Sequence, residues 1–412
     1  MNRPGPDHAP RGAGPALTRR RLLLLGAALP LLHACGRAAR PAATIRAFIP
    51  LEAYERAIFT GRLLPAFTRD SGIAVELAGG NGSEALAWLQ GDQQAGDARL
   101  DLAAIALEDL GGLIAGGRVA ALDDQRGALP AQTIAALLGA LEPCGSLYAL
   151  PLRPSLWLGY ANQPALAARG LAPPATWDAL GDIARTLHGA GQGQVILQGA
   201  TGRPAAQSLV ELIWAFDGDP LAPGDAGSLA AATYLADLAP ALSPLAPDAQ
   251  IDTVTAALAA GRAAFAPNWA LVAGTLLQHA GLRDLTVYPG PAGPAGAVHL
   301  VSGQVLVVPR AAANRDAALA FARYLLSLPV QRSLAGDLAW LPMRADAFDA
   351  APAWQRPVAD AAATALAHAR ALPPTVDRDR LDATLGDAFR AIAFERAAPQ
   401  VALARAAERL RP

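Results

Sequence analysis

Short apolar runs alternate along the chain with longer segments in which apolar residues recur every three or four positions. The short runs predict strands over residues 44–49, 73–77 and 100–107. Between the first two runs, Ile58, Leu63, Leu64 and Phe67 have the spacing of one buried helix face, which predicts a helix over residues 55–70. Such alternation of strands and helices is typical of an α/β fold.

The same helical spacing returns further along the chain. A helix is predicted to begin at Thr176, whose side chain suits an N-cap, with Asp178 in the first turn. Apolar residues from Leu381 to Ile392, and a second stretch over residues 401–410, predict two helices near the end. Residues 195–198 and 262–266 read as strands, and Pro267 is expected to end the second of them.

The N-terminus has the pattern of an export signal. Three arginines, Arg19 to Arg21, precede an apolar run over residues 22–32, which is too short to span a bilayer but suits a signal peptide. The run ends in Leu-His-Ala-Cys-Gly, which resembles the lipobox of bacterial lipoproteins and predicts Cys35 as a lipidated first residue. Cleavage at another small residue would instead discard Cys35. Arg19-Arg20 also resembles a twin-arginine signal, so both the general secretory and the twin-arginine export routes stay open.

Charge and composition exclude several functions. The chain has 34 basic and 35 acidic residues, a net charge of −1, and the two signs are interspersed, so no basic surface for nucleic acid is expected. It contains no lysine, which excludes a P-loop or Schiff-base lysine. Gly-x-Ser-x-Gly and His-Glu-x-x-His are absent and the histidines are scattered, so we expect no enzyme activity, cofactor or metal. With Cys35 lipidated, Cys144 would be the one remaining cysteine and could form no intramolecular disulfide.

Four stretches, in order, carry a family resemblance. They are residues 63–73 with Asp101; the motifs LYALP, YAN and PPATWDAL over 147–151, 160–162 and 173–180; GRAAF followed by Asn268-Trp269; and residues 302–309 with 317–346, which include LPMRAD and are echoed by Ala371-Leu372-Pro373-Pro374. Together they resemble the extracellular solute-binding proteins of ATP-driven sugar importers, the maltose-binding-protein-like family.

The resemblance implies a two-lobed periplasmic binding protein fold of type II, with hinge segments between two α/β lobes. It places a signal peptide at 1–35 and a tether at 36–43. Lobe 1 would comprise 44–152 and 303–338, and lobe 2 would comprise 157–298 and 341–412. The hinge crossings would be 153–156, 299–302 and 339–340.

The resemblance also implies a ligand site in the cleft between the lobes. Sugars present hydroxyls around a ring with apolar faces, so such a cleft needs aromatic planes together with carboxylates, amides and arginines. Trp269 occupies the position of the family's stacking tryptophan, although a core role is equally open. The full set of candidate ligand-binding residues is Glu52, Tyr54, Asn81, Ser83, Glu108, Asp109, Arg153, Trp214, Asp217, Asn268, Trp269, Gly303 and Trp340.

The function implied is that of an exported, membrane-anchored, periplasmic or cell-surface monomer. It would capture a carbohydrate or related polar solute and deliver it to the permease of an ABC importer. Aromatic residues make up only 5% of the chain, which favours a small ligand. Because Arg153 could pair with a phosphate or a carboxylate, a glycerophosphodiester or a sugar acid stays open as the ligand. The same fold could also bind a polyamine, an oxyanion or iron, and a secreted glycosidase would need two carboxylates at a fixed separation.

Overall fold

The computed structural model describes residues 43–91, 99–189, 193–279, 281–374 and 377–411. Residues 43–412 form one compact unit. The predicted signal peptide, Cys35 and residues 36–42 of the tether lie outside the described residues.

An N-terminal sheet forms as the sequence predicts. Strand β1 (Ala43–Phe48) runs parallel to β2 (Ile73–Leu77) and to β3 (Leu102–Ala106), and β7 (His299–Val307) runs antiparallel to β3. The three predicted strands are confirmed, with ends shifted by one or two residues. The helices of this part of the chain are α2 (Ala53–Ile58), α3 (Leu64–Ser71), α4 (Gly82–Gln90), α5 (Leu110–Ala115), α6 (Ala135–Leu141), α12 (Arg315–Leu326) and α13 (Leu328–Leu338).

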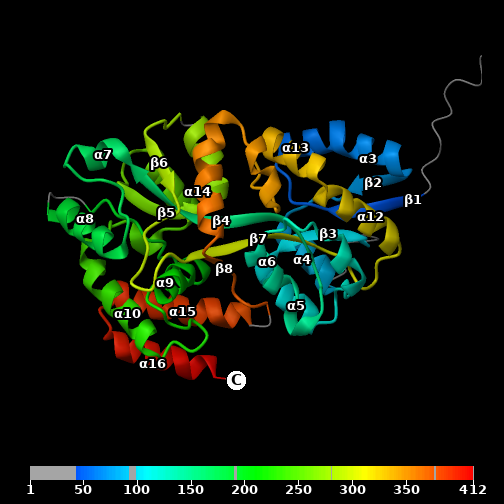
Figure 1. The fold of residues 1–412 in the computed structure, drawn as a ribbon. Coiled ribbons are helices and arrows are strands. Elements are labelled where there is room, and N and C mark those ends of the chain that lie inside the picture. Colours follow the sequence, from blue (N-terminus) through cyan, green and yellow to red (C-terminus); the bar gives the residue numbers. More distant parts are fainter. Residues whose placement is uncertain (1–42, 92–98, 190–192, 280, 375–376, 412) are drawn as a thin grey trace, which may run out of the picture. The chain divides into compact units, whose positions relative to one another are not determined.

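One long strand is shared by two sheets. Strand β4 (Leu150–Asn162) pairs with β7 over residues 150–156 and then with β5 (Phe265–Trp269) and β6 (Leu285–Tyr288) over 157–162. The predicted crossings 153–156 and 299–302 therefore lie side by side, with Ser155 opposite Ser302 and Leu156 opposite Val301. Figure 1 shows β4 and β7 running together from the β1–β3 sheet toward β5 and β6. The domain boundaries themselves stay a prediction.

Two apolar cores lie on either side of these strands. The first contains β1, β3, α12 and α13 and extends through α14 (Arg356–Leu366) to α11 (Ile251–Ala259) and β6. The second is built from the other helices: α8 (Trp177–Gly189), α9 (Arg203–Ala215), α10 (Ala226–Leu238), α15 (Arg378–Ala393) and α16 (Pro399–Leu410). Two short elements, α7 (Gln163–Ala167) and β8 (Ala369–Arg370), complete this region. The helices predicted near the end are confirmed as α15 and α16.

Thr176 caps a helix as predicted: its Oγ1 accepts a hydrogen bond from Ala179 N at 3.1 Å. Three other local predictions need correction. The helix predicted over 55–70 is interrupted by a π-helical turn (Phe59–Leu63) between α2 and α3. Residues 195–198 form only isolated bridges at Val195. The strand predicted over 262–266 is β5, which starts three residues later and contains Pro267. Proline is tolerated there because β5 ends the sheet order, so its N–H side needs no strand partner.

Candidate ligand-binding site between the lobes

A small pocket of about 10 Å³, enough for about one water molecule, lies beside the crossing strand β7. Leu107 and Glu108, directly after β3, face Leu300 to Ser302 of β7 and the segment Leu372 to Pro374, with Arg378 at the start of α15. The carboxyl end of β3 thus meets the second core across β7. Ligands of open α/β sheets bind at this kind of strand end.

Opposite charges meet beside this pocket. On the lobe 2 side, Arg203 and Arg378 each place Nε 2.8 Å from a different oxygen of Asp382, which is buried. On the lobe 1 side, burial raises the pKa of the Asp109 carboxyl, and the charge of Arg203 opposes that rise. The arrangement offers carboxylates from one lobe and guanidinium groups from the other, which are the acceptors and donors that a polyhydroxylated or charged ligand needs.

The two sides also touch through backbone. A Cβ on Gly111 in α5 would lie 1.5 Å from the carbonyl oxygen of Pro374. Only glycine allows α5 to approach the segment before α15 this closely, so Gly111 sets how near lobe 1 comes to that segment.

A second polar cluster lies at the crossing. The buried Glu55 carboxylate accepts a hydrogen bond from Trp340 Nε1 at 2.6 Å and lies 3.5 Å from Arg153 Nη1. The Arg153 guanidinium stacks 4.1 Å above the Trp340 ring and donates from Nε to Gln304 Oε1 at 3.1 Å. Tyr54, one residue before Glu55, is 57% exposed. We call Tyr54, Glu55, Arg153, Gln304 and Trp340 the hinge cluster; it brings together three of the predicted ligand residues.

Gly303 supports this cluster through its backbone. Its φ of 153° is strained for any other residue, and a Cβ there would lie 2.3 Å from the carbonyl oxygen of Arg153. Glycine is therefore required where β7 passes Arg153 and Pro154.

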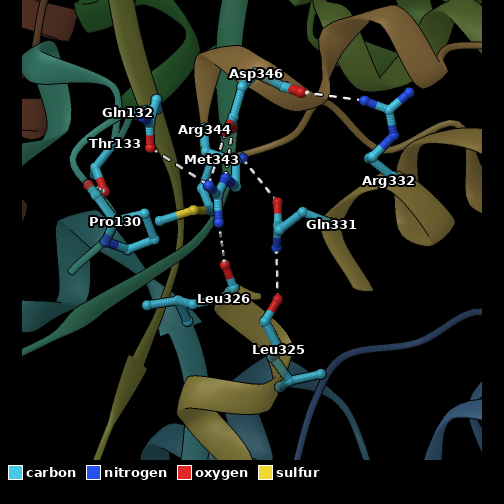
Figure 2. A network of polar contacts seen from close by, with 10 residues as sticks. All are labelled: Pro130, Gln132, Thr133, Leu325, Leu326, Gln331, Arg332, Met343, Arg344 and Asp346. Carbon is cyan, nitrogen blue, oxygen red and sulfur yellow. Dashed lines mark hydrogen bonds and ion pairs between the residues drawn. The ribbon is translucent and has the colours of Figure 1, made fainter. Parts of the chain in front are cut away.

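The LPMRAD motif, directly after Trp340, is tied to α13. Figure 2 shows the buried Gln331 accepting a hydrogen bond from Met343 N at 2.9 Å and donating to Leu325 O at 2.9 Å. Its amide also lies 3.3 Å from Leu152 O, directly before the first crossing. Arg344 pairs with Asp346 at 2.6 Å. The motif thus ties the segment after Trp340 to α13 and to β4.

Trp269 and Asn268 lie in the interior, at the end of β5. The Trp269 side chain is buried and meets Trp157 of β4 edge-on, with ring centroids 6.1 Å apart. Asn268 is fully buried: its Nδ2 donates to Ile251 O at 3.2 Å and Thr255 Oγ1 at 3.1 Å, and its Oδ1 accepts from Gln198 Nε2 at 3.2 Å. Its amide is therefore occupied by the protein, whereas the Trp157 indole N–H is buried without a partner.

The remaining predicted residues lie apart from both clusters or have structural partners of their own. Glu52 and Asn81 are the N-caps of α2 and α4, and Ser83 is exposed in the first turn of α4. Trp214 is buried near the end of α9, and Asp217 follows it, exposed and with φ 64°. The structure thus collects Tyr54, Arg153, Gly303 and Trp340 in one place and Glu108 and Asp109 in another.

Sequence reasoning missed the partners of these residues. Glu55, Arg203, Arg378 and Asp382 carry no motif of their own. Arg378 had one usable signal, because it follows shortly after the Pro373-Pro374 pair that belongs to the family pattern. Trp157 lies next to the predicted crossing 153–156. Because it is two positions after Ser155, the two side chains are expected on the same face of a strand, and this spacing could have pointed to Trp157.

These features define a class: two α/β lobes joined by adjacent strands, with polar groups of both lobes gathered at the junction. Residues 63–364 match the family described as bacterial extracellular solute-binding protein, which is more than half of the chain. The protein belongs to that family.

Solved structures share the fold of this chain. The GacH receptor of Streptomyces glaucescens GLA.O, solved unliganded and with acarbose, has 19% identity and a TM-score of 0.73, covering 89% of this chain and 97% of that one. Maltose-bound MalE3 of T. maritima has 18% identity and a TM-score of 0.74, covering 90% and 99%. A solute-binding protein of Thermotoga lettingae TMO, bound with α-D-tagatose, has 20% identity and a TM-score of 0.74, covering 90% and 99%.

A search of curated protein sequences gave no match. Within the ranges that the structure describes, no helix is both long and apolar enough to cross a membrane. The same ranges contain no group of three or more His, Cys, Asp or Glu side chains placed to hold a metal ion.

Proposed function

We propose that the protein is the substrate-binding component of an ABC importer, which captures a carbohydrate or related polar solute between its lobes and delivers it to a membrane permease. The observation that supports it best is that Glu108, after β3, and Arg378, at the start of α15, line one small pocket beside β7, which has to widen by movement of the lobes before it can hold a solute. Closure of two lobes around a solute removes it from water and strengthens the hydrogen bonds at such a junction.

The chemistry of the pocket supports a polyhydroxylated solute. Glu108 can accept hydrogen bonds from a solute and the Arg378 guanidinium, whose Nε is bound to Asp382, can donate from its remaining N–H groups, while Leu372, Pro373 and Pro374 provide an apolar wall. The structural neighbours were solved with acarbose, maltose and tagatose. A protein with these groups is expected to bind small sugars or sugar-like solutes.

A thermal-shift screen of unhydrolysable sugars, sugar acids, polyamines and glycerophosphodiesters, followed by calorimetry, tests the proposal. Glu108→Gln should weaken the binding of the best solute by about 1.5–3 kcal/mol, the usual worth of a hydrogen bond to a charged group. Glu76→Gln, which removes an exposed carboxylate from β2 of the same lobe, is the matched control. The site is refuted if no solute stabilises the protein, or if Glu108→Gln and Glu76→Gln lose the same affinity. Release of product from chromogenic glycosides would instead favour a glycosidase.

The finer parts of the proposal concern the N-terminus and the assembly state. We propose that Cys35 carries lipid and anchors a monomer at the membrane, because Cys35 stands at the end of the apolar run 22–32. Mass spectrometry of the native N-terminus tests the anchor: a mature chain lacking Cys35 would contradict it. Light scattering of the purified protein tests the monomer.

A further inference from the structure

A second cavity lies in lobe 1, at the end of the sheet remote from the interlobe pocket. It has a volume of about 330 Å³ and is lined by Trp88, Leu100, Pro309 and three arginines, Arg99, Arg118 and Arg310, among others. Arg99 and Leu100 precede β3, whereas Glu108 follows it. At about 3.3 Å per strand residue, the five residues of β3 separate the two pockets by roughly 15 Å or more.

The three arginines are exposed, and the isolated bridge between Val119 and Pro309 brings Arg118 and Arg310 together. Arg310 N donates to Arg118 O at 2.8 Å, which fixes the loop after β7 beside the loop after α5. The Arg118 guanidinium lies against Gly91 at the carboxyl end of α4: a Cβ on Gly91 would be 3.0 Å from Arg118 Nη1. The helix end attracts this positive charge and holds it at the cavity.

Within the described ranges, none of these arginines forms an ion pair or side-chain hydrogen bond. Among the described residues, the carboxylate nearest to Arg99 in sequence is Asp101, which accepts hydrogen bonds from Arg46 N at 3.0 Å and Asn314 N at 2.9 Å. Asp92 and Asp97 lie outside the described residues. Three like charges around one cavity repel one another, and a bound anion relieves that repulsion.

We propose that this cavity binds a phosphate ester group. Guanidinium groups match phosphate oxygens with paired hydrogen bonds, and several of them suit a group that carries more than one negative charge. The half-buried Trp88 ring forms an apolar wall for the rest of the ligand. The phosphate ester is either a soluble molecule or a lipid headgroup. The lipid is an alternative because β1, parallel to β3, also begins at this end of the sheet, and the predicted lipid anchor precedes β1 in the sequence.

Calorimetry of the protein with glycerol phosphate and inorganic phosphate tests the shared chemistry. Arg118→Gln and Arg310→Gln should each weaken binding about tenfold or more, since each removes charged hydrogen bonds. Affinity should also fall steeply with added salt. Arg169→Gln, which removes an exposed arginine after α7, is the matched control and should bind normally. Urea unfolding of every variant confirms that it is folded.

Sedimentation with vesicles distinguishes the two sources. A preference for phosphatidylglycerol over phosphatidylcholine vesicles that the double variant Arg118→Gln/Arg310→Gln loses would identify a lipid headgroup. Binding of glycerol phosphate without that preference would identify a soluble ester. The proposal is overturned if neither phosphate nor phosphatidylglycerol binds, or if Arg169→Gln weakens binding equally. Solute binding between the lobes should be the same in all these variants, so failure here leaves the proposed function standing.

Discussion

Glu55 should be one of the most sensitive positions of lobe 1. Its side chain is 5% exposed and holds two hydrogen bonds and an ion pair: Trp340 Nε1 at 2.6 Å, Glu52 N at 2.8 Å and Arg153 Nη1 at 3.5 Å. Removing one member of a buried ion pair typically costs about 3–5 kcal/mol, because the other charge stays buried. The Arg153 side chain is 25% exposed, so water recovers part of that cost. We therefore expect Glu55→Ala to lose about 3 kcal/mol.

Glu55→Gln separates charge from shape. Arg153 loses its charged partner in both variants, but the amide oxygen of Gln can still accept the Trp340 hydrogen bond, so the loss should be smaller than for Glu55→Ala, about 1–2 kcal/mol. Urea unfolding followed by circular dichroism measures both variants, with Glu76→Gln as the control for an exposed carboxylate of the same lobe. A loss below about 1 kcal/mol for Glu55→Ala would refute the reasoning, since a value of that size is typical of exposed ion pairs.

Three further predictions concern single residues. Burial raises the pKa of Asp109, so the folded protein binds this proton more tightly than the unfolded chain, and the stability that Asp109 contributes falls as pH rises above the ordinary carboxyl pKa. Asp109→Asn should therefore make the urea midpoint depend less on pH between acid and neutral pH. A variant that is less stable than the parent protein at neutral pH would contradict this prediction. Gly303→Ala should cost at least about 1–3 kcal/mol by overpacking against Arg153 O, visible as a lowered melting temperature. Trp269→Ala should cost about 3–5 kcal/mol, because the indole is buried against Trp157; calorimetry on the folded variant then shows whether solute affinity falls as well, as ligand stacking requires.

Periodicity predicted local structure well where burial repeats along one element. The strands β1, β2 and β3 and the Thr176 cap follow from patterns within a few residues. It failed where the tertiary setting overrides a local rule. The edge position of β5 tolerates Pro267 inside the strand, and the π-helical turn breaks a helix whose apolar spacing looks continuous.

For the site, the family pattern, the order of the elements and several of the charged and aromatic residues can be read from the residues alone. Which of these residues come together depends on the fold. Glu55 and Trp340 are 285 residues apart, and Glu108 and Arg378 line one pocket although 270 residues separate them in the sequence. Asn268, a candidate for the ligand, has its amide occupied by Gln198, Ile251 and Thr255. Such pairings depend on strand register and on which buried polar atoms have no partner in the core. Neither property produces a periodic pattern in the sequence.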